Sequence, residues 1–329
     1  MSLTALALVL LAAVFHAIWN IVAKRAGGDS RFALLSALWV VVLWAPAAAW
    51  FGWHELPRWG VAQWAVVGAS AAVHLLYFNT LLHGYREADL TVVYPVARGS
   101  APLVTVAAAV LLLGESLTLA ALAGVAAVCA GVFLVAGGPG LWRQVQNPAA
   151  HARVRAGLRW GAATGLLIAG YSVIDGYAVK VLLVGPVLLD YFGNLLRVPL
   201  LLPVALRDRP AFMHALRTQW KPALVMGLLA PAGYVMVLYA LTLAPLSRVA
   251  PAREVSMLIA ALLGGHLLGE GERRLRLAGA ACIALGGGGT GFGLMRLAGV
   301  ACRPDPLADL QLLTRSHACI RAAFLDFAP

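Results

Sequence analysis

Residues 98–115 read RGSAPLVTVAAAVLLLGE, an arginine followed by an apolar run that ends in Leu-Leu-Gly-Glu. Residues 253–270 read REVSMLIAALLGGHLLGE, with the same arginine at the start and the same four residues at the end. The second stretch begins 155 residues after the first, and Gly279 follows Gly124 by the same distance. A shared offset of this kind indicates a chain built from two related halves.

The composition is that of a chain whose solvent is lipid. Hydrophobic residues make up 61% of the sequence and charged residues 12%, whereas a soluble domain has about 45–50% and about 25%. Lipid offers the backbone no hydrogen-bond partner, so only helices or a closed β-barrel can span it. The apolar runs here are continuous over about 20 residues, which favours helices over short alternating strands.

Ten apolar segments are each long enough to cross about 30 Å of hydrocarbon. We expect them at residues 2–23, 32–52, 60–83, 90–113, 117–137, 157–180, 186–206, 221–243, 246–268 and 274–295. The longest connection divides them five and five, and because five is odd the second half enters the bilayer upside down. The predicted fold is all-α: a polytopic membrane protein with ten transmembrane helices in two inverted five-helix repeats.

The predicted domain boundaries follow from these segments. The first five-helix repeat covers residues 1–137, a linker covers 138–156 and the second repeat covers 157–295. Residues 296–329 have no long apolar run, and we expect a poorly ordered tail. The apolar start resembles a signal-peptide core but has no basic residue before it, so we interpret it as a retained first helix.

The net charge of +11 does not predict a nucleic-acid partner. Most Lys and Arg residues lie in short loops between apolar segments, where membrane topology explains them, and no basic stripe forms on a soluble element. These residues concentrate in the loops that follow odd-numbered segments. The positive-inside rule then places those loops in the cytoplasm and both termini outside. We expect a multi-pass protein of a bacterial-type cytoplasmic (inner) membrane.

The sequence gives no positive sign of catalysis. It contains no nucleophile-elbow or zinc-protease motif and no pair of catalytic carboxylates at a shared site. Its four cysteines form no metal-binding pattern; they are Cys129, Cys282, Cys302 and Cys319. We therefore predict no enzyme activity, no catalytic residues, no metal and no cofactor.

Arg98 and Arg253 are the first candidates for solute binding. Each lies inside an apolar segment, where an arginine costs about 2.5–3.5 kcal/mol on insertion scales and normally faces a cavity or a partner. A carboxylate or another anion on the solute is one such partner. A structural salt bridge or snorkelling to the interface is the alternative, and the adjacent Glu254 could neutralise Arg253.

Prolines and glutamates mark the same two segments. Pro95, Pro102 and Pro251 lie inside them, and proline removes a helix hydrogen bond. Broken helices at matching places of two repeats point to a transporter's binding region, although a static kink is the alternative. Glu115 and Glu270 follow the ends of the segments, where a gate is one interpretation. The other interpretation is local: a glycine that caps the end of one helix and a glutamate in the first turn of the next are both favourable.

Further polar residues inside apolar segments complete the candidate cavity. His16, Trp19 and Asn20 share one turn of the first segment, and Asp175 lies in the matching stretch of the sixth. A buried carboxylate must be protonated, paired or hydrated, so Asp175 is the candidate for proton coupling, with a structural hydrogen bond as the alternative. Tyrosines that combine an apolar ring with a hydroxyl could line the cavity; these are Tyr77, Tyr94, Tyr234 and Tyr239.

Asn194 and Arg197 form a second polar spot in the seventh segment. They lie on one helix face because they are three residues apart. Small residues recur at four-residue spacing in the fifth segment, among them Ala123, Ala127 and Gly131. Such spacing lets helix backbones approach closely, either within the bundle or across a homodimer.

The chain resembles the EamA-type, ten-helix branch of the drug/metabolite transporter superfamily. The resemblance is carried by residues 94–102, by Leu-Leu-Gly-Glu at 112–115 with its echo at 267–270, and by the opening His-Ala-Ile-Trp-Asn at 16–20. It implies a central cavity lined mainly by the first, third, fourth, sixth, eighth and ninth helices. The residues to which it points are Pro95, Arg98, Pro102, Glu115, Arg253 and Glu270.

The second half departs from this pattern. Ala250 stands where the first half has Pro95, and Met257 stands where it has Pro102. The resemblance implies a secondary transporter that moves a small polar or amphipathic metabolite across the lipid bilayer by alternating access. Two alternatives stay open at this point: an integral-membrane enzyme acting on lipid or lipid-linked substrates, and a non-transporting scaffold or sensor.

Overall fold

The computed structural model describes residues 2–26, 29–88, 90–135 and 151–254, together with 278, 279, 281–283, 285 and 286. Within these ranges every regular element is a helix. The elements are α1 (Leu3–Ala26), α2 (Ser30–Glu55), η1 (Leu56–Arg58), α3 (Val61–Glu87), α4 (Leu90–Leu113), α5 (Leu119–Val135), α7 (His151–Lys180), α8 (Pro186–Leu206), α9 (Arg209–Leu243) and α10 (Leu246–Arg253). The first eight predicted segments each correspond to a long helix, and the ninth begins where expected.

Two helices begin earlier than their apolar segments. α7 starts at His151 rather than at residue 157, so it includes the end of the predicted linker. α9 starts at Arg209 rather than at residue 221. The Asp208 side chain accepts a hydrogen bond from the Ala211 amide, and a proline occupies the first turn, so this helix starts at a local cap rather than at the edge of the apolar run.

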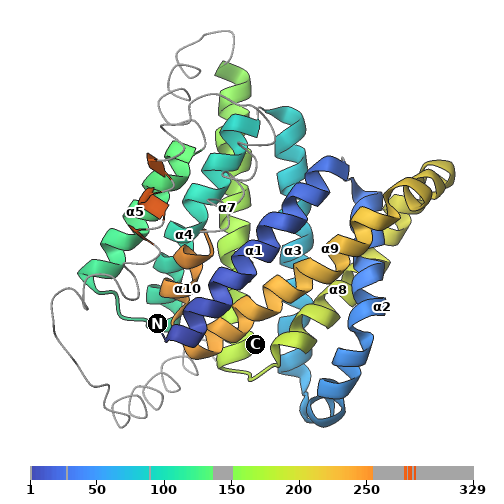
Figure 1. The fold of residues 1–329 in the computed structure, drawn as a ribbon, viewed down its shortest axis with the longest axis horizontal. Helices are drawn as coiled ribbons and strands as arrows, with labels where there is room; N and C mark the ends of the chain where they lie inside the picture. The colour runs from blue at the N-terminus through green and yellow to red at the C-terminus, as the bar shows by residue number, and fades with distance from the viewer. Residues whose placement is uncertain are drawn as a thin grey trace, which may run out of the picture.

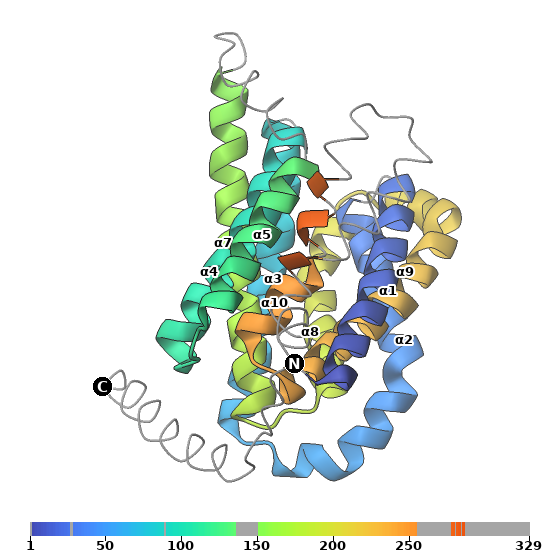
Figure 2. The same ribbon diagram turned by 60° about the vertical axis from the view of Figure 1, so that its left-hand side comes forward.

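The helices pack in pairs that repeat between the halves. Counting five helices onward relates α1 to α7, α2 to α8, α3 to α9 and α4 to α10. α1 packs along α9, and the matching pair α7 and α3 also pack together (Figure 1). α4 packs along α7, and its counterpart α10 contacts α1 (Figure 2). These exchanged contacts are those of two inverted five-helix repeats that interlock.

The small residues of α5 are used within the chain. A Cβ atom on Gly131 would lie 2.5 Å from the carbonyl oxygen of Gly279 and 2.8 Å from the backbone nitrogen of Ile283. One on Gly286 would lie 2.5 Å from the carbonyl oxygen of Gly124. Glycine is therefore required where the two backbones touch. The homodimer that the spacing also allowed stays an untested prediction.

The outer surface of the bundle is apolar. Trp50, Trp53, Leu111 and Leu119 are 78%, 80%, 81% and 85% exposed, and side chains of this kind belong in lipid or at its interface. Within the described residues, α2, α3, α7 and α9 each contain a stretch long and apolar enough to cross a membrane. The chain is a polytopic membrane protein.

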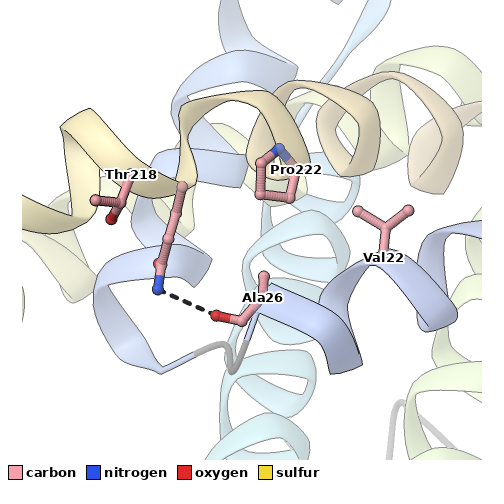
Figure 3. Close-up of a pocket in the computed structure, with 5 residues that line it drawn as sticks. Val22, Ala26, Thr218 and Pro222 are labelled. Atoms are coloured by element: carbon pink, nitrogen blue, oxygen red, sulfur yellow. Dashed lines mark hydrogen bonds between the residues drawn. The ribbon is translucent and has the colours of Figure 1, made fainter.

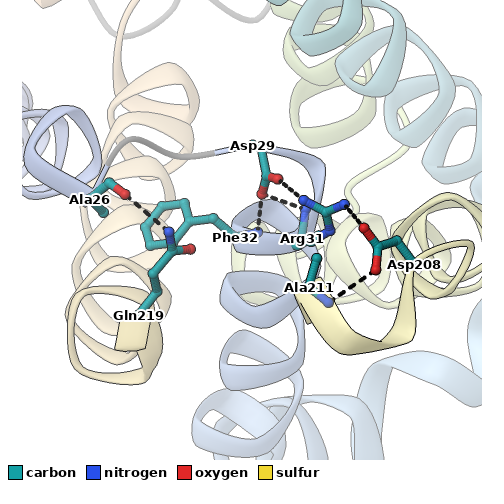
Figure 4. Close-up of polar contacts among 7 residues, drawn as sticks. All are labelled: Ala26, Asp29, Arg31, Phe32, Asp208, Ala211 and Gln219. Carbon is teal, nitrogen blue, oxygen red and sulfur yellow. Dashed lines mark hydrogen bonds and ion pairs between the residues drawn. The ribbon is translucent and has the colours of Figure 1, made fainter. Parts of the chain in front are cut away.

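Alternate connections meet at opposite ends of the bundle. At one end Arg31, which follows α1, pairs with Asp29 at 2.9 Å and with Asp208 at 3.4 Å (Figure 4). At the other end the Glu55 carboxylate accepts a hydrogen bond from the Gly185 amide. The loops after odd-numbered segments and those after even-numbered segments thus lie at separate ends, as the alternation of basic residues requires.

Candidate functional site

The two repeated arginines lie in one interior region. Arg98, on α4, places its Nε 3.5 Å from Oε2 of Glu254, the residue that ends α10. The two side chains are 13% and 6% exposed. Arg253 lies over the ring of Tyr234, 5.6 Å from its centroid. The fourth and ninth segments therefore place an arginine each in the same region, and an ion pair joins the first half to the second.

Tyr234 connects Arg253 to Asp175, the predicted proton-coupling residue. The Tyr234 hydroxyl, on α9, donates a hydrogen bond to Oδ2 of Asp175, on α7. The Asp175 side chain is 1% exposed. The sequence analysis proposed these two residues separately, and the fold brings them into contact from two helices of the second repeat.

His74 is a central residue that the sequence reasoning missed. Its Nε2 lies 4.0 Å from Oδ2 of Asp175, and its ring stacks on Tyr171 with centroids 4.0 Å apart. Tyr77 packs edge-on against the same Tyr171, at 5.6 Å. Ser70, His74 and Tyr77 follow at spacings of four and three, the signal of one helix face.

A second polar group lies on α8. The side-chain amide of Asn194 donates to Oδ2 of Asp190 at 3.1 Å, and Arg197 donates to Oδ1 of Asn194 at 3.3 Å. The charge of Arg197 acts on both Asp190 and Asp175. The spot predicted at Asn194 and Arg197 therefore extends the central site rather than standing apart from it, and Asp190 completes it.

A small cavity lies beside the arginines. It is lined from four helices by Val9, Ala12, Ala13, His16, Arg98, Gly233, Tyr234, Val237 and Arg253. Its volume is about 20 Å³, which is room for one water molecule. His16 packs edge-on against Trp19, with ring centroids 4.7 Å apart. This conformation is closed around the arginines, so a metabolite would need the helices to separate.

A wider depression lies elsewhere, where α1 meets α9. It measures about 500 Å³ and is lined by Val22, Ala26, Thr218, Gln219 and Pro222 (Figure 3). The Gln219 side chain crosses it to donate to the carbonyl oxygen of Ala26 at 3.1 Å. None of the five residues is charged, and the two polar ones, Thr218 and Gln219, donate their hydrogen bonds to backbone carbonyl oxygens.

Glu115 contacts the other half of the chain. Gly114 ends α4 with φ of +65°, and the Glu115 amide donates back to the Ala109 carbonyl, a glycine C-cap as expected. The residue, however, does not lie in the first turn of the following helix, because α5 begins only at Leu119. The Glu115 carboxylate accepts from the amides of Leu246 at 2.7 Å and Ser247 at 2.9 Å, at the start of α10.

Lys180 completes this contact. Its Nζ lies 3.2 Å from Oε1 of Glu115. Burial opposes ionisation of Glu115, but the ammonium group of Lys180 and the amides of Leu246 and Ser247 outweigh it and hold the pKa of this carboxyl below its usual value. A charged Glu115 thus joins the end of α4 to α7 and α10.

The comparisons with known proteins decide the family. The sequence profile of the EamA-like transporter family matches residues 3–137 and again residues 155–289. The chain belongs to the EamA-like transporter family. A crystal structure of a protein that is 17% identical in sequence superimposes with a TM-score of 0.65, over 90% of this chain and 99% of its own. At that identity the likeness shows the fold alone. No curated protein matches the chain.

Members of the EamA-like family are membrane transporters of small molecules, and their two repeated halves correspond to the duplication seen in this sequence. The ion pair between Arg98 and Glu254 joins those halves at the site. Among the residues that the structure describes, no group of three or more His, Cys, Asp and Glu side chains could hold a metal ion.

The remaining predicted residues of this EamA-like chain divide into two groups. Pro102 and Pro251 are buried, and both α4 and α10 continue as helices through their prolines. Neighbouring helices can support a helix around the lost hydrogen bond, so the described residues show no break at either proline, and the predicted role of these prolines as bending elements stays a prediction. The side chains of Asn20, Tyr94 and Pro95, and all of Glu270 and the tail 296–329, lie outside what the structure describes.

Proposed function

We propose that this chain moves a small polar or amphipathic metabolite across a bacterial-type cytoplasmic membrane by alternating access. The observation that carries the proposal is the interior ion pair between Arg98 and Glu254, which comes from opposite repeats. Rocking one repeat against the other must separate or re-pair these two groups, and a polar solute can take the place of one of them.

The contact of Glu115 supports a gate at one end of the bundle. Its carboxylate joins α4 to the first turn of α10 and to Lys180. These helices carry Arg98 and Arg253. Release of Glu115 would let α4 and α10 move apart and widen the small cavity between the arginines.

The alternative of a lipid-modifying membrane enzyme has less support. Such an enzyme needs its acid and base groups where a lipid headgroup can reach them, in a groove at the membrane surface. Here the Asp175 side chain is 1% exposed and is enclosed by Tyr234 and His74. Polar groups enclosed between two repeats favour a solute path over a surface reaction.

The proposed orientation follows the basic loops. The end of the bundle that carries Arg31 and Asp208 would face the cytoplasm, and the end that carries Glu115 and Lys180 would face outward. We further propose that solute movement is coupled to protons through Asp175.

The test begins with a thermal-shift screen of the purified protein against a metabolite library. A ligand that binds the folded state stabilises it by about RT ln(1 + [L]/Kd), so a solute raises the melting temperature. Uptake of that radiolabelled solute into proteoliposomes should then be lost when Arg98→Ala and Arg253→Ala are combined.

The matched control is Arg217→Ala, because Arg217 lies exposed on α9 away from the site. It should transport like the parent protein. Undiminished uptake by a folded double variant at Arg98 and Arg253 would refute their role.

A further inference from the structure

Asp175 has two partners of different kinds on one oxygen. Its Oδ2 accepts the hydrogen bond from the Tyr234 hydroxyl and also lies 4.0 Å from Nε2 of His74. The other oxygen, Oδ1, is buried without a hydrogen-bond partner. A buried carboxylate with one oxygen unsatisfied is costly to keep charged, so this is a place where a proton would bind.

The orientation of His74 fixes which nitrogen faces the carboxylate. Its Nδ1 lies 3.0 Å from the carbonyl oxygen of Ser70. A carbonyl oxygen can only accept, so a hydrogen bond at this distance places the hydrogen on Nδ1. The Ser70 hydroxyl, 3.3 Å from the same nitrogen, is then an acceptor there. In the neutral ring Nε2 then holds a lone pair, and that lone pair lies on the side of Asp175. A proton arriving between the two can rest on either group, and the pair gains one positive charge in both cases.

Charged groups from other helices act on this pair. Arg197 on α8 and Arg253 on α10 both act on the charge of Asp175, and both also act on His74. On the other sides Tyr171 stacks on the imidazole at 4.0 Å, and the Ser70 hydroxyl on α3 lies 3.3 Å from Nδ1 of His74. The carboxyl group of Asp190 on α8 also interacts with the charge of Asp175. The pair is therefore enclosed by elements of both repeats, and its charge affects both.

Tyr234 links the pair to the arginine proposed to bind solute. Its hydroxyl bonds to Asp175, and its ring face carries Arg253 at 5.6 Å. Protonation of Asp175 removes the negative charge of the carboxylate that accepts the hydrogen bond from the Tyr234 hydroxyl. The hydrogen bond between α9 and α7 is then weaker.

We propose that His74 and Asp175 form a single proton-binding pair whose proton is exchanged during transport, with Tyr234 connecting the pair to Arg253. This inference rests on the proposed function and deepens it, because it gives the proton proposed for Asp175 a two-residue site. The proton pair itself can be tested without any solute.

The experiment is an infrared pH titration of the purified full-length protein in lipid nanodiscs, following the carbonyl stretch of protonated carboxyl groups. A component that titrates in the parent protein should vanish in Asp175→Asn. In His74→Gln the remaining Asp175 component should move its midpoint by about one pH unit or more, a tenfold change in proton affinity, because interacting groups titrate together.

Two variants keep the test decisive if a polar substitution disturbs folding. Tyr234→Phe keeps the ring and removes only the hydroxyl, and it should also move the midpoint. Arg253→Ala should move it as well if the solute arginine and the proton pair are connected.

His83→Gln is the matched control, because His83 packs on Trp160 with ring centroids 4.4 Å apart, and it should leave the midpoint unchanged. If the midpoint of the Asp175 component is the same in His74→Gln, His83→Gln and the parent protein, the proposal that His74 and Asp175 share a proton is overturned. A midpoint unmoved in Arg253→Ala would overturn its connection to the solute site. Failure of the proposed transport would instead appear in the uptake assay and leave this titration intact.

Discussion

At the scale of single residues, the ion pair between Arg98 and Glu254 has the largest expected energetic effect. Removing one partner of a buried pair leaves a charge without compensation, which costs about 3–5 kcal/mol. We expect Arg98→Met to destabilise the protein by an amount of this order, and Arg98→Met combined with Glu254→Met to recover a large part of the loss. Chemical unfolding in detergent micelles measures both.

The comparison is a double-mutant cycle. Glu254→Met alone completes it, because Arg98 then loses the partner whose oxygen lies 3.5 Å from its Nε. Simple addition of the two single effects would show that the side chains do not interact in the folded protein.

At the scale of elements, the contact between Glu115 and α10 predicts a pH dependence. The pKa of Glu115 is lowered in the folded protein. Its carboxylate therefore stabilises the fold fully above its ordinary pKa of 4.5, and this stabilisation is lost as the pH falls through the lower folded value. Glu115→Gln should flatten the acid side of a plot of melting temperature against pH.

Glu87→Gln is the control for that plot, because Glu87 is exposed at the end of α3. Its acid limb should follow the parent protein. Parallel acid limbs for Glu115→Gln and the parent would mean that the contact with α10 does not persist in solution.

The close approach at α5 gives a second prediction for an element. Gly131→Val places a side chain where the backbone of Gly279 already lies, so we expect a loss of about 1–3 kcal/mol from overpacking. Gly68→Ala is the matched control, since a Cβ there meets nothing within 4 Å. Gly131→Val should melt at a clearly lower temperature than Gly68→Ala. Equal melting temperatures would mean that α5 does not pack against the backbone of Gly279.

At the scale of the whole molecule, the separation of loops predicts how the chain lies in the bilayer. Ser116 and Pro210 are exposed at opposite ends of the bundle. In a background without the four native cysteines, we expect Ser116→Cys to react with a membrane-impermeant thiol reagent in intact cells. Pro210→Cys should react only after the membrane is opened. The reverse labelling would invert the proposed orientation.

The sequence predicted the helices better than their partners. Long apolar runs determine where helices lie, and a shared offset reveals the duplication, so both could be read without coordinates. The partner of a single polar residue could not be predicted, because nothing local to His74 indicates Asp175. Glu115 illustrates the limit most clearly. Its local chemistry suggested an acidic residue in the first turn of the next helix, whereas its carboxylate accepts from amides 131 and 132 positions further along the chain.

The exchanged pairing of α1 with α9 and of α3 with α7 has a consequence for biosynthesis. The first five helices leave the ribosome before their principal neighbours exist, so during that interval their inward faces have only lipid or the insertion machinery to cover them. We therefore expect that neither repeat folds stably by itself. A repeat expressed without the other would be a target for membrane quality control. The two repeats would become stable only when they are expressed together.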